Sequence, residues 1–217
     1  DVPEVRDMKQ ARQLRRSELG EHFIPCLAVL AICFFLGIVL GQVCARRAAA
    51  ESGPELYRYL SDYFQSGVEP DGPAAFLSAL LLYYRYPVLA FLLGFASVGL
   101  VGLPLLSAAF GFFLSFSVGC FASAFGGSGV LLAFSAMGLR CILTFPCYFW
   151  LAVPAFQHSV SLARFSFGGG RRACAVPYGS AYFLRFAVCS GALFLGVIAE
   201  LYAVPYWVEL VCGRIFG

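Results

Sequence analysis

Long apolar runs dominate the pattern along this chain. Between Arg85 and Arg140 there is no charged residue and no histidine. A transmembrane helix needs about 20 apolar residues, so this run alone is long enough for more than one crossing. The pattern predicts an integral membrane protein, because no soluble core element is this long and this free of charge.

The apolar runs account for five net crossings, and the predicted fold class is an all-α, polytopic transmembrane helical bundle. The expected spans lie within residues 23–45, 86–125, 130–162 and 181–203. The run 86–125 is long enough for two spans. We expect the turn Gly102-Leu103-Pro104 to divide it, because proline cannot donate its backbone hydrogen bond.

The charged residues predict how the chain is oriented. Residues 1–22 carry a basic cluster before the first span, which places this N-terminal segment in the cytoplasm and leaves 23–217 as a single transmembrane domain. The net charge of +3 is small and scattered, so we expect no nucleic acid as partner. Composition agrees with membrane lipid as the surrounding medium, since 60% of residues are hydrophobic and 12% charged.

A polar segment, 46–83, separates the first two spans on the outer side. Within it apolar residues recur at helical spacing after Pro54, namely Leu56, Tyr59, Leu60, Tyr63 and Phe64. This spacing predicts a short extracytoplasmic amphipathic helix, either lying on the membrane face or packed against the bundle. The tyrosines around Arg85 then suggest an aromatic belt at the interface.

Small residues recur four apart in two of the spans. They are Gly37 and Gly41 in the first span, and Gly111, Ser115, Gly119 and Ser123 in the third. In lipid, close backbone approach across such faces is how helices associate. These residues predict tight packing within the chain, an interface with a subunit or partner, or the lining of a passage.

The fourth segment contains Pro146 and Pro154, which predict a broken or re-entrant element. A true hairpin at Pro146 would give six crossings in place of five. Two charges are expected inside spans, Arg140 and Glu200. Arg140 could pair with Glu200, bind carbonyls freed by Pro146, or extend to the interface.

Groups suited to catalysis are scarce in the apolar segments. No carboxylate occurs between Asp71 and Glu200, and the histidines are His22 and His158. Hydrolysis needs paired carboxylates or a His-supported nucleophile, and metal binding needs clustered ligands. We therefore expect no enzyme activity, no cofactor and no metal, and we interpret the cysteines within the spans as small hydrophobic residues.

Several ordered motifs resemble the stage II sporulation protein M family of endospore-forming bacteria. Residues 56–64 are similar to its extracytoplasmic L-x-x-Y-L-x-x-F/Y-F element, 111–119 to its G-x-x-x-G-F-T-x-G run, and Glu200 with Pro205 to its final Glu and Pro. The fourth-segment signature, Leu-Pro-Gln/His-Asn, is replaced here by residues 138–141, Gly-Leu-Arg-Cys.

The resemblance implies a non-enzymatic scaffold in the bacterial cell membrane at the sporulation septum. It would recruit stage II sporulation proteins D and P, which degrade peptidoglycan, for septal wall thinning and forespore engulfment. On this interpretation Leu56, Tyr59, Leu60, Tyr63 and Phe64 form the docking element. The alternative is the membrane subunit of a transporter or exporter coupled to an ATPase, with its path around Arg140 and Pro146.

Overall fold

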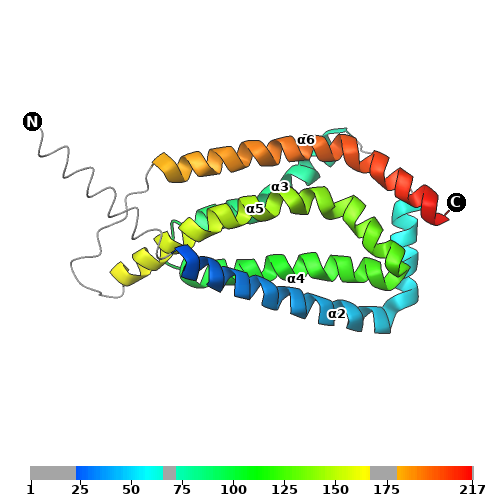
Figure 1. Ribbon diagram of the computed structural model, residues 1–217, viewed down its shortest axis with the longest axis horizontal. Coiled ribbons are helices and arrows are strands. Elements are labelled where there is room, and N and C mark those ends of the chain that lie inside the picture. The colour runs from blue at the N-terminus through cyan, green and yellow to red at the C-terminus, as the bar shows by residue number, and fades with distance from the viewer. Residues whose placement is uncertain (1–22, 66–71, 167–179, 217) are drawn as a thin grey trace, which may run out of the picture.

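The computed structural model describes residues 23–65, 72–166 and 180–216, and every secondary-structure element in these ranges is an α-helix. The helices are α2 (Phe23–Gln65), α3 (Gly72–Leu93), α4 (Gly99–Phe125), α5 (Gly127–Ser166) and α6 (Ser180–Phe216). Successive helices run in opposite directions along one bundle axis (Figure 1). The predicted all-α bundle is confirmed.

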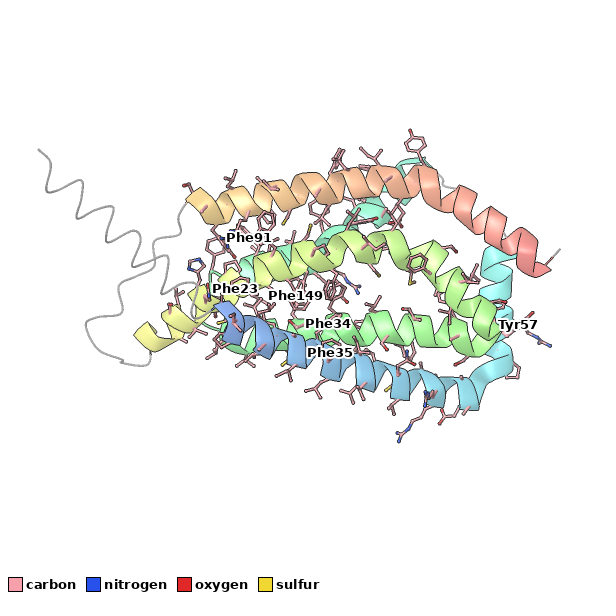
Figure 2. The ribbon with its side chains drawn as sticks, viewed as in Figure 1. Phe23, Phe34, Phe35, Tyr57, Phe91 and Phe149 are labelled. Atoms are coloured by element: carbon pink, nitrogen blue, oxygen red, sulfur yellow. The ribbon has the colours of Figure 1, made fainter. Side chains whose placement is uncertain are left out.

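Each of the five helices contains a segment long and apolar enough to cross a membrane. These segments are Phe23–Glu51, Phe76–Leu93, Gly99–Phe125, Met137–Ala163 and Ser180–Tyr202. Large apolar side chains point outward along them, and neighbouring residues show the division clearly. Phe34 is 4% exposed whereas Phe35 is 63% exposed, and Figure 2 shows both on α2. An apolar outer surface is what lipid solvates.

The fourth segment differs from the expected broken element, because α5 is one helix through both Pro146 and Pro154. It bends along its length and does not reverse direction (Figure 1). A proline in a transmembrane helix removes one backbone hydrogen bond, and packing by neighbouring helices can offset that loss. Residues 151–156, around Pro154, are all buried. The hairpin that would have made six crossings is absent from this helix.

The turn between the second and third spans lies at residues 94–98, so the turn expected at Gly102-Leu103-Pro104 is wrong. Pro104 lies inside α4, near its start, where a missing backbone N–H costs one bond. The actual turn is stabilised by α5, because the Ser159 hydroxyl donates to the Ala96 carbonyl at 2.8 Å. Such a bond matters in a bilayer, where no water satisfies free carbonyls.

The second span begins at Phe76, so the aromatic belt expected at Tyr83, Tyr84 and Tyr86 is also wrong. Tyr83 is fully buried, and its hydroxyl donates to the Gly196 carbonyl of α6 at 3.2 Å. The sequence pattern was misleading because Arg85 appeared to end the apolar run. The charge lies within the span, and part of the expected outer segment 46–83 belongs to the span as well.

The core is aromatic and joins α2, α4 and α5. Phe34 packs edge-on against Phe110 and Phe149, with ring centroids 5.6 and 5.7 Å apart. Figure 2 shows Phe34 and Phe149 lying close together between the helices. Tyr86 of α3 extends this cluster, with its ring centroid 4.5 Å from that of Phe110. Edge-to-face aromatic pairs of this kind add to the packing energy of the bundle.

Candidate functional site

The small residues of the first span lie at the interface between α2 and α4. A Cβ atom added to Gly41 would stand 2.5 Å from the Phe112 carbonyl oxygen, and one added to Gly37 would overlap the Ala108 carbonyl. Two helix backbones therefore approach too closely here for any side chain. The sequence left three roles open for the small residues. Gly37 and Gly41 serve the first of them, tight packing within the chain.

The opposite side of this interface is formed by three of the four small residues of α4. A Cβ added to Gly111 would overlap the Phe34 carbonyl, and one on Gly119 would lie 2.6 Å from that of Ala45. The Ser115 hydroxyl donates to the Ile38 carbonyl at 2.9 Å.

Ser123 is exposed and takes no part in this contact. A four-residue repeat rotates by about 40° per step around a helix of 3.6 residues per turn. The fourth member of the stripe has therefore turned away from α2.

Arg140 and Glu200 form an ion pair between α5 and α6. The guanidinium donates from Nη2 to Oε1 and from Nε to Oε2, the latter at 3.3 Å. The Arg140 side chain is 22% exposed and that of Glu200 10% exposed. Of the three alternatives for Arg140, pairing with Glu200 is the one present in the structure. Two opposite charges in one contact lower the cost of burying each of them.

Helix α3 completes the surroundings of this ion pair. The Arg140 guanidinium lies over the Tyr83 ring, 5.6 Å from its centroid, and Tyr83 is held by the Gly196 carbonyl one turn before Glu200. Gly196 lets Tyr83 approach, because a Cβ there would be 3.0 Å from the Tyr83 ring. Thr144, one turn after Arg140, is buried and its hydroxyl has no hydrogen-bond partner among the described residues.

The ion pair is shallow in the bundle. Arg140 lies about 5 Å along the helix axis from Met137, where the fourth apolar segment begins, and Glu200 about 3 Å from Tyr202, where the fifth ends. Both of these segment ends lie at the end of the bundle where α2 leaves its span (Figure 1). We call this the Tyr57 end. The position is that of an interfacial clamp between α5 and α6 more than that of a mid-membrane pathway.

The expected amphipathic helix is continuous with the first span. Helix α2 passes through Pro54 and ends at Gln65, and its last part turns to run across the Tyr57 end of the bundle (Figure 1). The Tyr57 ring packs on Phe125 at the end of α4, with centroids 5.1 Å apart. The side chains of Leu56, Tyr59, Leu60, Tyr63 and Phe64 lie outside the described residues, so the docking role stays a prediction.

No protein-family model, curated protein or solved structure matches this chain. Its resemblance to the stage II sporulation protein M family therefore stays a prediction, carried by the motifs quoted above. In residues 23–65, 72–166 and 180–216, no three histidine, cysteine or carboxylate side chains gather in a way that could hold a metal ion. The geometry that carries a functional argument is that of helix contacts and exposed surfaces.

Several polar contacts between helices were not found from the sequence. The hydroxyls of Ser107 and Tyr148 share a hydrogen bond 2.7 Å long, which joins α4 to α5 in the core. Ser159 holds the turn after α3, as described above. A lone serine in an apolar run carries no signal for its partner, because the partner lies on another helix. Arg85 was identified as a charge, but its depth was misjudged.

Proposed function

We propose that the protein is a non-enzymatic membrane scaffold, and that partners dock on the last part of α2 at the Tyr57 end. The observation that carries the proposal is the turned end of α2, which lies across the bundle and is held by the contact between Tyr57 and Phe125. If the N-terminus is cytoplasmic, as its basic cluster predicts, the first crossing would leave this end outside the cytoplasm.

A docking surface is most useful when it is already ordered. The first part of α2 is locked to α4 through Gly37, Gly41 and Gly111, and the last part is held at Phe125. Two points of attachment on the same helix fix its direction at both ends. A pre-ordered surface loses less conformational entropy when a partner binds.

The polar groups inside the bundle support the same role. Arg140 pairs with Glu200, Ser107 bonds Tyr148, and Ser159 satisfies a turn carbonyl. Each of these contacts joins α5 to another part of the chain. They provide a stable frame, and no pair of them is arranged as a nucleophile with its base.

The resemblance to the stage II sporulation protein M family gives the partners. On this proposal they are the peptidoglycan-degrading stage II sporulation proteins D and P, and the site is the sporulation septum of a bacterial cell membrane. The scaffold would hold these hydrolases at the membrane while the septal wall is thinned and the forespore is engulfed. Residues 56–64 would supply the contact with the partners.

Transport is the second candidate, and the bent α5 favours it. A helix with Pro146 and Pro154 bends readily, and the unpartnered Thr144 hydroxyl lies one turn from Arg140. In this case an ATPase would couple to the cytoplasmic side. Arg140→Leu would then abolish function while the bundle stays folded.

The test is to tag the protein in its own host, solubilise membranes gently from sporulating cells, and identify the proteins that co-purify. The wild type is compared with Tyr59→Asp combined with Phe64→Asp. Val98→Asp is the control, because it places an aspartate in an exposed turn at the opposite end. Thermal melting in detergent shows whether each variant keeps the bundle.

We expect hydrolases with the wild type and the control but not with the double variant, and similar melting of all three. Unchanged recovery of hydrolases with a folded double variant would overturn the docking site. Recovery of a cytoplasmic ATPase in place of hydrolases would overturn the scaffold and leave transport.

A further inference from the structure

Arg85 lies near the middle of the second apolar segment, Phe76–Leu93. It is about 13 Å along the helix axis from Phe76 and about 12 Å from Leu93, the two ends of the second apolar segment. Its neighbour on α4 gives the same depth, because Phe113 lies near the centre of the segment Gly99–Phe125. The Arg85 guanidinium is 5.5 Å from the Phe113 ring centroid.

The contacts of Arg85 are aromatic and neutral. Its Nη2 donates to the Tyr86 hydroxyl at 2.6 Å, and its guanidinium lies 4.5 Å from the Tyr86 ring centroid. These contacts orient the side chain, and cation–π attraction offsets part of the burial cost. They leave the positive charge itself unmatched.

No carboxylate whose side chain the structure describes forms an ion pair with Arg85. The three carboxylates with described side chains are Glu51 and Glu55, at or beyond the end of the first span, and Glu200, which is paired with Arg140. Arg85 is nevertheless exposed on the outside of the bundle. A charge at this depth costs at least about 2.5 kcal/mol on insertion scales, so such residues ordinarily have a partner.

The residues around Arg85 form an exposed, apolar stripe on the outside of the bundle. Leu82 and Leu89 lie one turn to either side of Arg85 on α3, and they are 41% and 44% exposed. Phe113 borders the stripe from α4 and is 51% exposed. We call these four residues the Arg85 stripe. It consists of apolar side chains with one cation at the centre.

Depth and charge together identify what binds there. Lipid phosphates lie beyond a hydrocarbon half-thickness of about 15 Å, which exceeds the reach of an arginine side chain extended toward the interface. A second copy of the chain offers no unpaired carboxylate at this depth among its described residues. We propose that the Arg85 stripe binds a transmembrane helix of a partner protein that carries an Asp or Glu in its membrane-embedded part.

This inference goes beyond the scaffold proposal, because it concerns a surface inside the membrane and not the turned end of α2. The two can fail separately. Loss of docking at residues 56–64 leaves the Arg85 stripe intact, and a neutral residue at position 85 leaves the Tyr57 end unchanged.

The experiment uses the full chain in vesicles of phosphatidylcholine and a labelled synthetic transmembrane helix of leucine and alanine. The helix carries Glu, Gln or Leu at its centre, and energy transfer to labelled protein reports association. The measurement is made at pH 8.5, because burial favours the neutral form of a carboxyl group. Protein variants are Arg85→Gln and Arg85→Lys, with Arg46→Gln as a control at an exposed arginine near the end of the first span.

We expect the Glu helix to associate with wild type and Arg46→Gln at least tenfold more tightly than the Leu helix. Arg85→Gln should remove this preference, and Arg85→Lys should retain part of it because the charge remains. Equal association of the Glu and Leu helices with wild type would overturn the proposal, as would a preference that survives Arg85→Gln. Loss of the preference on adding phosphatidylglycerol would also overturn it, since the site would then bind an anionic headgroup.

Discussion

Gly41→Ala is the sharpest test of the interface between α2 and α4. The added Cβ would stand 2.5 Å from the Phe112 carbonyl oxygen, 3.0 Å from the Phe116 nitrogen and 3.1 Å from the Ser115 Cβ. Two of these three atoms belong to the backbone and cannot rotate away. Because ordinary contact begins near 3.4 Å, the helices must separate by about 0.9 Å at this point.

The cost of this separation has two parts. Overpacking a well-packed site costs about 1–3 kcal/mol. The hydrogen bond from Ser115 to the Ile38 carbonyl, 2.9 Å long, would lengthen to about 3.8 Å and leave hydrogen-bond range. An interhelical bond in a membrane contributes about 0.6 kcal/mol. Alanine also favours the helix over glycine by about 0.5–1 kcal/mol, so the net destabilisation is about 0.6–3 kcal/mol.

The assay is reversible unfolding in mixed micelles, with Gly191→Ala of α6 as the matched control. A Cβ on Gly191 meets nothing within 4 Å, so this variant gains the same helix preference without any overlap. We expect Gly191→Ala to be as stable as the wild type or slightly more stable. If Gly41→Ala were as stable as Gly191→Ala, close backbone approach would not be what holds α2 to α4.

Three further predictions concern other contacts. Arg140→Glu and Glu200→Arg should each destabilise the bundle by about 1–3 kcal/mol in the same assay, and the double exchange should recover most of this loss; additive losses would exclude a direct pair. Ser159→Ala should cost about 1 kcal/mol because turn carbonyls lose their donor, whereas Ser161→Ala, whose bond stays within α5, should cost less; the reverse order would contradict the role of Ser159. In a cysteine-free background, single cysteines in the turns after α3 and after α4 should react with a membrane-impermeant reagent from opposite sides, and reaction from one side would contradict five crossings.

The sequence determined the fold class and limited the number of crossings to five or six. A charge-free run from 86 to 139 is too long for the core of a soluble protein. The length of each apolar run sets how often it can cross the membrane. The repeats at Gly37 and Gly111 also signalled close helix contact, since small residues at that spacing share a face. These features depend on local composition and helical periodicity, which the sequence contains.

The tertiary structure decided where the helices end and which residues meet. Pro104 predicts the end of a helix, but the turn lies at 94–98. There the Ser159 hydroxyl of α5 donates a hydrogen bond to a turn carbonyl. Arg85 resembles a span end, yet it lies mid-span beside Phe113. The pairing of Arg140 with Glu200 was one alternative among three. Each outcome depends on a neighbour from a distant part of the chain, because in a bilayer polar groups must find their partners on other helices.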